Sequence, residues 1–336
     1  MLDHRLWYLA KIYCVTCGPS VWDVGSFLGP VAEREASSIS PMSFFEKDQY
    51  LPFVVRGFHA TLDNMAVSEG FEGDSFTWLS QKVGINARIT TLEGELQETR
   101  LAPVIHRLLF TYFFEKFRQL DIYAVTQAPV GMREYLKLLP LFSCGGNLNH
   151  LQPPMMWISG GLRPSKSVVH ADSHHNQHCV LKGSKKFMLI PPSVPVDTPE
   201  YGWVYVENPD GTMREGFEDA YGDYAAEIDY NNMDLTRFPK WRDVPWFLAE
   251  LKAGDCLYMP EDWYHYVESE AAPTLTWHQW FHAADKWIDE ADCSVQEVAI
   301  SKCIFKKDDQ SSVPRNFWDL YPDQTSVCTT GELYSQ

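Results

Sequence analysis

Long hydrophobic runs are missing from this chain: none of its apolar stretches reaches roughly 18 residues, the length that a membrane-spanning helix needs. No membrane partner is therefore expected. The chain also has no Asn-x-Ser/Thr acceptor for N-glycosylation, and this absence favours the cytoplasm or the nucleus. Residues 6–17 resemble the core of a signal peptide, but Lys11 interrupts them, so the lumen of the endoplasmic reticulum is the alternative location.

Basic side chains are scarce. The chain has 28 Lys and Arg against 45 Asp and Glu, which gives a formal net charge of −17. Nucleic acids and anionic membranes bind surfaces where Lys and Arg cluster, because such surfaces release counterions. The balance therefore disfavours nucleic acid as a partner, and it permits a basic peptide.

Cysteines occur without the spacing of a disulfide scaffold or of a zinc-ligand array. The chain has eight of them, and Cys14 and Cys17 form a CxxC that no second pair accompanies. In a chain of this size, scattered cysteines favour a reducing compartment. Internal repeats are missing too, and a hydrophobic content of 45% predicts a globular protein.

Two kinds of hydrophobic periodicity divide the chain. Helical spacing marks residues 65–82, 101–120 and 132–141, and Pro41 is typical of the start of another helix. Strands are expected at 51–57, 121–127, 155–159, 167–172, 177–181, 185–190, 246–252, 256–259, 263–268 and 274–281. Gly183 is expected in a hairpin turn, since glycine readily adopts a positive φ. Helices followed by many short strands predict an α+β, mainly β fold around a β-barrel or jelly roll.

The segment 194–242 is polar, acidic and longer than an ordinary loop, which predicts a functional lid or an insertion. Its acidic side chains include Glu207, Asp210, Glu215, Glu218, Asp219, Asp223, Glu227 and Asp229. They are expected either to line a groove for a basic peptide or to form a solvated acidic loop.

His170 and Asp172 lie two residues apart in an apolar run, so both side chains are on one face if that run is a strand. A second strand and turn are expected to deliver His265. Two neutral imidazoles and one carboxylate on one face form the metal triad of non-haem Fe(II) oxygenases, which leaves positions open for a chelating cosubstrate and for O₂. Taken alone, such a pair is a weak signal, because a buried histidine more often has a purely structural role in the core.

Several spaced motifs surround this pair. They are Met156-Trp157-Ile158-Ser159, His170-x-Asp172, Lys182-Gly183-Ser184-Lys185-Lys186-Phe187, Pro191-Pro192, the run from Gly254 to Pro260, and Trp263-x-His265-x-Val267. In this order they closely resemble the JmjC oxygenases, and among these the small protein hydroxylases that act on lysyl and asparaginyl side chains. The resemblance covers residues 120–282 well and residues 37–60 loosely.

The resemblance implies a double-stranded β-helix, a cupin-type jelly roll, over residues 120–282, with 194–242 as an acidic insertion. A helical and strand region (1–119) precedes it. A C-terminal helix (283–305) and a loose tail (306–336) follow it.

It also implies that His170, Asp172 and His265 bind Fe(II), and that 2-oxoglutarate and O₂ complete the site. Lys185 matches the lysine that pairs with the distal carboxylate of 2-oxoglutarate. Alternation with Phe187 and Leu189 predicts that Lys185 points inward, with Lys186 as the alternative. Three more side chains match positions near the cosubstrate or the iron: Ser167, Tyr123 and Asn176.

The chain departs from the family pattern at one strand. His278 stands where the family often has Asn, which places an extra imidazole near the cosubstrate or the iron. His174, His175 and His178 also crowd the first motif. An extra histidine near the iron could be a ligand or could tune the pocket, but we interpret these three as surface turn residues. The departure leaves the substrate open.

The predicted activity is that of an Fe(II)- and 2-oxoglutarate-dependent dioxygenase, a hydroxylase of protein or peptide side chains that releases succinate and CO₂. The main alternative is an inactive cupin-like scaffold, which the complete set of His170, Asp172, His265 and Lys185 disfavours. A JmjC lysine demethylase is the next alternative, disfavoured because no zinc-ligand array accompanies the motifs. A tRNA-modifying oxygenase is disfavoured by the net charge of −17.

Residues 283–305 have apolar side chains near helical spacing: Trp287, Ile288, Val295, Val298, Ala299 and Ile300. C-terminal helices form the dimer in the hydroxylases that this chain resembles. A homodimer through this helix is therefore expected, unless the apolar face folds back on its own barrel.

Overall fold

The computed structural model describes residues 18–83, 88–93, 105–119, 122–128, 130–204, 225–289 and 298–299. The signal-like stretch 6–17, the pair Cys14 and Cys17, and the tail 306–336 lie outside them. Within the described ranges, every helix is too short or too polar to cross a membrane.

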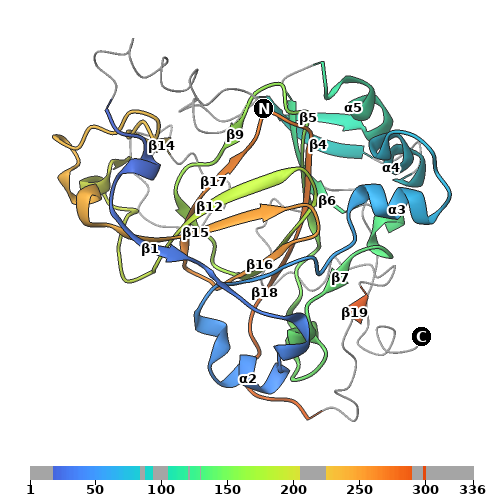
Figure 1. The fold of residues 1–336 in the computed structure, drawn as a ribbon, viewed down its shortest axis with the longest axis horizontal. Coiled ribbons are helices and arrows are strands. Elements are labelled where there is room, and N and C mark those ends of the chain that lie inside the picture. Colours follow the sequence, from blue (N-terminus) through green and yellow to red (C-terminus); the bar gives the residue numbers. More distant parts are fainter. Residues whose placement is uncertain are drawn as a thin grey trace, which may run out of the picture.

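Two large β-sheets form the centre of the described structure (Figure 1). The smaller sheet contains β1 (Ser26–Pro30), β15 (Pro245–Lys252), β12 (Ser184–Ile190), β17 (Tyr264–Ser269) and β10 (His170–Ala171), with β9 (Ser165–Lys166) also paired to β17. The larger sheet contains β2 (Ala32–Glu33), β3 (Phe53–Val55), β16 (Cys256–Met259), β11 (His175–Lys182), β18 (Thr274–Phe281), β8 (Met155–Ser159), β6 (Ile122–Gln127), β4 (Arg88–Glu93) and β5 (Ile105–Leu109).

Successive strands alternate between the two sheets. The chain passes from β10 to β11 and β12, and later from β15 through β16 and β17 to β18, and it changes sheet at each step. This winding makes the core a cupin-type jelly roll, as the sequence predicts. The strands expected from residue 155 onward are present, but the expected strand 167–172 is shortened to β10, and β9 lies just before its expected start.

Part of the space between the sheets is filled by apolar side chains. Phe187 and Leu189 of β12 pack there with Leu257 and Met259 of β16. Met188, between Phe187 and Leu189, belongs instead to a cluster on the other face of the smaller sheet. Alternate residues of β12 are therefore buried on opposite faces, because a strand points successive side chains to opposite sides.

The apolar cluster on the other face of the smaller sheet includes side chains of the insertion 194–242. The described part of the segment 194–242 contains η6 (Pro199–Tyr201), β13 (Trp203–Val204), β14 (Ala225–Ala226) and η7 (Pro239–Asp243). Tyr201, Trp241 and other buried side chains of this lobe pack against Val21, the first residue of η1 (Val21–Asp23). The described part is thus a packed lobe and not a solvated loop. Among the acidic side chains, Glu227 pairs with Arg237 and Asp229 bonds the amide of Asn231; the other six lie outside the described residues.

Short helices cover the outer face of the larger sheet. They are α2 (Pro41–Glu46), α3 (Leu62–Ser68), α4 (Ser75–Val83), α5 (Phe110–Lys116) and α6 (Val130–Arg133). Pro41 does begin α2, and the Ser40 hydroxyl accepts the Ser43 amide at its N-terminus, as an N-cap should. Figure 1 places α3, α4 and α5 together on the side of the core opposite the insertion lobe.

Two helix predictions are wrong in part. Residues 105–109 of the expected helix 101–120 form β5, which pairs with β4 at the edge of the larger sheet, and α5 follows it. Strand pairing here outweighs a helical pattern. The expected helix 132–141 is reduced to α6, followed by β7 (Lys137–Leu138) and η4 (Pro140–Phe142). Pro140 cannot occupy the interior of a helix without breaking it.

Gly183 adopts a positive φ of 79°, as expected, but it does not form a hairpin. It joins β11 of the larger sheet to β12 of the smaller one, so it is a corner between the sheets. A Cβ at this position would lie 2.8 Å from a methyl group of Thr274. Both the φ angle and the close approach require glycine here.

The predicted C-terminal helix is wrong for the residues that are described. Residues 283–289 have no helical turns, and β19 (Val298–Ala299) pairs with β7. The Trp287 ring lies over Gly145 and Ile288 lies over Gly146, close enough that a Cβ on either glycine would clash. This segment folds back on its own chain because the two glycines leave space for it. The homodimer stays a prediction.

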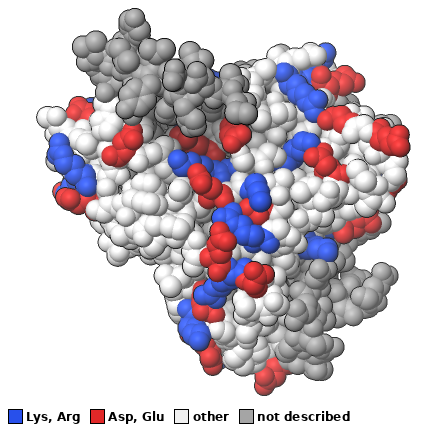
Figure 2. Space-filling view, in the orientation of Figure 1, with Lys and Arg blue, Asp and Glu red and all other residues white. Residues whose placement is uncertain are grey.

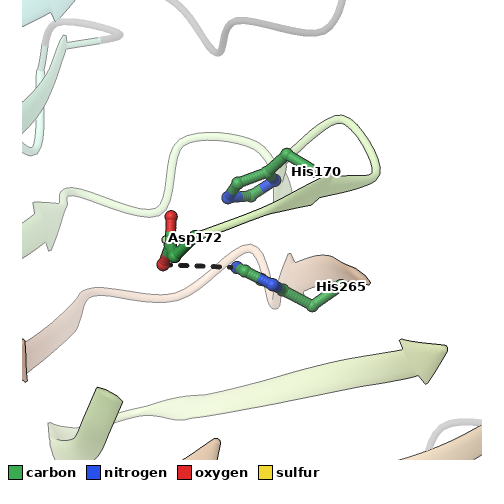
Figure 3. A group of neighbouring side chains, drawn as sticks. All are labelled: His170, Asp172 and His265. Atoms are coloured by element: carbon green, nitrogen blue, oxygen red, sulfur yellow. Dashed lines mark ion pairs between the residues drawn. The ribbon is translucent and has the colours of Figure 1, made fainter. Parts of the chain in front are cut away.

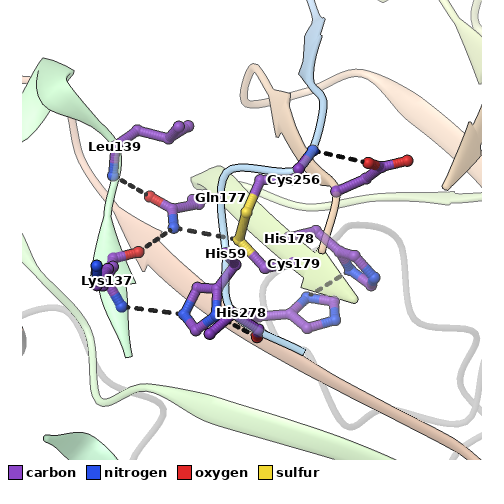
Figure 4. The surroundings of a disulfide bond; sticks show 11 residues. His59, Lys137, Leu139, Gln177, His178, Cys179, Cys256 and His278 are labelled. Atoms are coloured by element: carbon purple, nitrogen blue, oxygen red, sulfur yellow. Dashed lines mark hydrogen bonds between the residues drawn. A yellow bond between two sulfur atoms is a disulfide. The ribbon is translucent and has the colours of Figure 1, made fainter. Parts of the chain in front are cut away.

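The expectation of reduced cysteines is contradicted, because the described Cys144, Cys179 and Cys256 are all disulfide-bonded. Cys179 of β11 and Cys256 of β16 are cross-strand partners joined by a disulfide (Figure 4). Both side chains lie in the cluster under the helices, on the outer face of the larger sheet. The disulfide therefore crosslinks β11 and β16 on the face of the sheet that points away from the space between the sheets.

Candidate metal centre

His170 and His265 are brought together by one strand pair. β10 and β17 are antiparallel, and their register sets His170 directly opposite His265. Asp172 follows β10, where its carbonyl accepts the amide of Asp262 from the turn before β17. Asp262 holds a positive φ of 64°, a conformation that Asp tolerates better than most residues. Figure 3 shows the three side chains directed at a common space.

The backbone fixes the tautomer of both imidazoles. His170 donates from Nδ1 to the carbonyl of Val168 at 2.8 Å, and His265 does the same to Trp263 at 3.0 Å. Each ring therefore has its proton on Nδ1 and presents the lone pair of Nε2. This is the arrangement that metal-binding histidines require, with the second nitrogen held by a hydrogen bond.

The three groups fit a divalent metal. One ligand atom from each of His170, Asp172 and His265 lies within 4.8 Å of the others, and Asp172 Oδ2 is 3.9 Å from His265 Nε2. Ligands about 2.1 Å from a metal and at right angles to one another lie about 3 Å apart, so a small inward movement completes the site. Two nitrogens and one carboxylate oxygen match the preferences of iron.

Burial keeps His265 neutral. It lowers the pKa of His265 to about 4, and the neighbouring His170 adds to this effect. An imidazole that is neutral near pH 7 has its lone pair available for a metal.

The insertion lobe supports the same strands. The Tyr230 hydroxyl accepts the amide of Val169, next to His170, and the Tyr264 hydroxyl donates to Asp197 at 2.7 Å, next to His265. Burial raises the pKa of Tyr230 well above its ordinary value, so the hydroxyl stays protonated.

Lys185 points into the space between the sheets. It is 6% exposed, whereas Lys186 lies on the opposite face with its ammonium 3.8 Å from the centre of the Trp22 ring. The structure thus favours the first of the two orientations considered for this strand. Lys185 Nζ lies 3.4 Å from the hydroxyl of Tyr123, which comes from β6.

Ser167 lies on the same path. Its hydroxyl oxygen accepts the amide of Val267, and β17 directs alternate residues inward from Val267 to His265. Leu189 pairs with His265 and Lys185 pairs with Ser269, so four residues of β12, about 13 Å, separate the metal end from the lysine end. The structure brings Lys185 and Tyr123 together and places Ser167 between them and the triad.

A cluster of polar side chains lies between the metal end and the lysine end of the pocket. His178 of β11 and His278 of β18 are cross-strand partners with their Nδ1 atoms 3.3 Å apart, and Asn176 Nδ2 donates to His278 Nδ1 at 3.1 Å. His278 Nδ1 is then an acceptor, which places its proton on Nε2. His178 donates from Nδ1 and keeps a lone pair on Nε2.

Both Nε2 atoms are buried without a partner among the described residues. The pair therefore offers one N–H and one lone pair to whatever occupies this part of the pocket. Burial holds the pKa values of His178 and His278 well below their ordinary value, and Lys185 is a further cause for both. His178 also contributes to the lowered pKa of His278. Figure 4 shows the pair beside the strand that carries Cys179.

The interpretation of three histidines as surface residues is wrong. His175 is 4% and His178 1% exposed, both on β11, and His174 is half-buried against His282. Sequence reasoning also missed two half-buried aromatic side chains near the triad, Trp157 and Trp280. The sequence did contain a signal for the burial of His178. It lies two residues after Asn176, so on a strand both side chains are on the same face.

Comparisons with known proteins agree with this geometry. The model of the cupin-like domain family matches residues 113–286, which is more than half of the chain. Jumonji C domain-containing protein 5 of Drosophila melanogaster is 31% identical over 135 residues, which are 40% of this chain and 29% of that protein. The bifunctional peptidase and (3S)-lysyl hydroxylase JMJD7 of Homo sapiens is 30% identical over 119 residues, 33% of this chain and 36% of that protein.

The lysine-specific demethylase JMJ30 of Arabidopsis thaliana is 26% identical over 175 residues, 48% of this chain and 35% of that protein. The matches thus span about a third of the length of these relatives. The chain belongs to the cupin-like domain family, and its relatives place it with the JmjC proteins.

Proposed function

We propose that this chain is an Fe(II)- and 2-oxoglutarate-dependent oxygenase that hydroxylates a side chain of a protein or peptide. One observation carries the proposal: His170, Asp172 and His265 converge with both Nε2 lone pairs free for a metal, at one end of a pocket whose other end has a buried lysine. JmjC relatives include a lysyl hydroxylase.

Each end of the pocket has a separate task. The triad would hold the iron, which with 2-oxoglutarate and O₂ supplies the oxidising chemistry. Lys185 would pair with the distal carboxylate of 2-oxoglutarate, and Tyr123 and Ser167 would add hydroxyl contacts. The buried Lys185 ammonium has the charge opposite to that of a carboxylate, so a dicarboxylate is a natural occupant.

A scaffold without catalysis is the main competing function. Nothing in scaffolding requires two Nδ1-protonated histidines opposite each other, with an inward lysine about 13 Å along the same sheet. A demethylase uses the same site, and one relative is named as such.

The deciding experiment measures succinate. The purified chain is supplied with Fe(II), ascorbate and 2-oxoglutarate, and with a panel of proteins and peptides. We expect iron-dependent succinate from the wild type and none from Asp172→Ala or His170→Ala. Glu261→Ala, which removes a half-exposed carboxylate that lies near His175 and is not part of the converging group, is expected to behave as wild type.

Mass spectrometry of the same reactions identifies the chemistry. A substrate heavier by one oxygen atom supports hydroxylation, whereas loss of a methyl group with release of formaldehyde supports demethylation. Absence of iron-dependent succinate with every substrate, together with unchanged binding behaviour in the triad variants, would favour the scaffold.

A further inference from the structure

Asp172 receives a hydrogen bond from an indole. Nε1 of Trp280 donates to Asp172 Oδ2 at 3.1 Å. Among the described residues this is the one hydrogen bond to that carboxylate, and the same oxygen is the one that lies 3.9 Å from His265 Nε2. The indole therefore contacts the triad at the oxygen that faces the second histidine.

We infer that Trp280 is a positioning residue that fixes the Asp172 carboxylate for the metal, an inference that rests on the proposed function. Asp172 lies just beyond the end of β10, and its side chain is 23% exposed. A carboxylate in such a place rotates freely about χ2 unless a partner holds it. A charge-assisted bond from the indole occupies one lone pair of Oδ2 and selects one orientation.

Trp280 is itself held in place. Its ring meets the Trp157 ring edge-to-face, with centroids 5.4 Å apart and planes at 89°. Its carbonyl accepts the amide of Gln152 at 2.8 Å, which ties the end of β18 to the segment before β8. In the pairing of β18 with β11, Trp280 lies opposite Asn176. The donor thus comes from a rigid strand of the larger sheet, whereas Asp172 follows a strand of the smaller one.

The consequence is a link between the two sheets at the metal. His170 and His265 are oriented by carbonyls two residues earlier in their own strands. Asp172 is oriented from the opposite sheet. The relative position of the sheets therefore controls the third ligand alone, and removal of the indole N–H is expected to weaken metal binding while sparing the fold.

The test is a metal titration of three variants. Co(II) replaces Fe(II) as an air-stable probe, and its visible absorption reports both affinity and ligand geometry. Trp280→Phe keeps an aromatic ring and removes the N–H, so we expect Co(II) to bind about 10- to 100-fold more weakly, as for other residues that orient a metal ligand. Trp157→Phe keeps an aromatic contact with Trp280 and leaves the hydrogen bond, so its affinity should equal that of the wild type.

Two results would overturn the inference. One is a Trp280→Phe variant that binds Co(II) as tightly as wild type with the same absorption spectrum. The other is an equal loss in Trp157→Phe, because this would assign the effect to ring packing. Circular dichroism of the metal-free variants establishes that each is folded, and Trp280→His, which retains a ring N–H, should restore part of the affinity.

A metal-independent measurement separates this inference from the proposed function. In the metal-free protein, the indole ¹H–¹⁵N resonance of Trp280, assigned by its loss in Trp280→Phe, should move and exchange faster in Asp172→Ala. A wild type that binds no Co(II) would contradict the proposed function, while the resonance shift would still report the hydrogen bond. A resonance that does not respond to Asp172→Ala would contradict the inference itself.

Discussion

His170 and His265 face each other across one antiparallel strand pair, with ring centroids 4.1 Å apart, and each donates its Nδ1 proton to the carbonyl two residues before it. The same local bond occurs on both strands. The tautomer of each ligand is therefore set by its own backbone and does not depend on a distant partner. A metal meets two lone pairs that are already oriented, which lowers the cost of forming the site.

Replacement of Lys185 by alanine should weaken 2-oxoglutarate binding about tenfold or more and leave Co(II) binding unchanged. A charge-assisted hydrogen bond contributes roughly 1.5–3 kcal/mol. Lys186→Ala is the matched control, because its ammonium lies over Trp22 on the opposite face of β12. Competition titration with 2-oxoglutarate measures both. Equal affinities in the two variants would assign the cosubstrate to another cation.

Replacement of His278 by phenylalanine should destabilise the protein. The change leaves the buried donors Asn176 Nδ2 and His178 Nδ1 without their acceptor, at a cost of about 1–3 kcal/mol for each group. Urea unfolding of the metal-free protein measures the difference. His278→Asn, which restores a polar acceptor of smaller volume, should lose less. A phenylalanine variant as stable as wild type would show that the pair is not hydrogen-bonded as described.

Stability should fall in mild acid, in part through His175. Burial lowers the pKa of His175 to about 4, with His282 and His174 as lesser causes, whereas an unfolded histidine titrates near 6.5. The unfolded chain therefore binds the additional proton first. The contribution of His175 is complete above about pH 6.5 and is lost as the pH falls towards 4, by at most about 3 kcal/mol.

Unfolding curves between pH 7 and pH 4.5 measure this loss. His175→Gln keeps a donor for the Tyr258 hydroxyl but does not titrate, so its unfolding free energy should decline less steeply than that of wild type. Parallel slopes would show that His175 is protonated in the folded protein.

Removal of the disulfide should lower stability without changing the metal site. Cys179 and Cys256 are separated by 77 residues in the sequence, and a crosslink over such a loop contributes about 2–4 kcal/mol. The double variant Cys179→Ala/Cys256→Ala should therefore unfold at lower urea concentration, as should the reduced wild type. Its Co(II) affinity should be unchanged, because both side chains lie on the outer face of the sheet. Equal stability of oxidised and reduced protein would mean that the pair is a dithiol in solution.

The sequence predicts some parts of this structure well because the information is local. β8, β16 and β18 match the expected ranges, since each is a short run of apolar and β-branched residues between turn residues. The inward direction of Lys185 follows from simple alternation on β12. The convergence of His170, Asp172 and His265 was expected because the ordered motifs surround them.

Other features depend on pairing between distant segments. Residues 105–109 are a strand only because β4 lies beside them. The bond from Trp280 to Asp172 requires the register of β18 on β11 together with the place where β10 ends, and neither can be obtained from periodicity. His178 and His278 are partners for the same reason, a hundred residues apart in the chain.

The insertion lobe leaves the core between β12 and β15, two strands that are direct hydrogen-bonded neighbours. The pairing between β12 and β15 is as regular as that of a hairpin whose strands are joined by a short turn. It ends at Leu189, which is the β17 partner of His265. The lobe is thus attached at the metal end, and the lysine end lies far from it. A change in the length or surface of the lobe would leave intact the register that sets His170 opposite His265, so the same triad can be combined with different recognition surfaces.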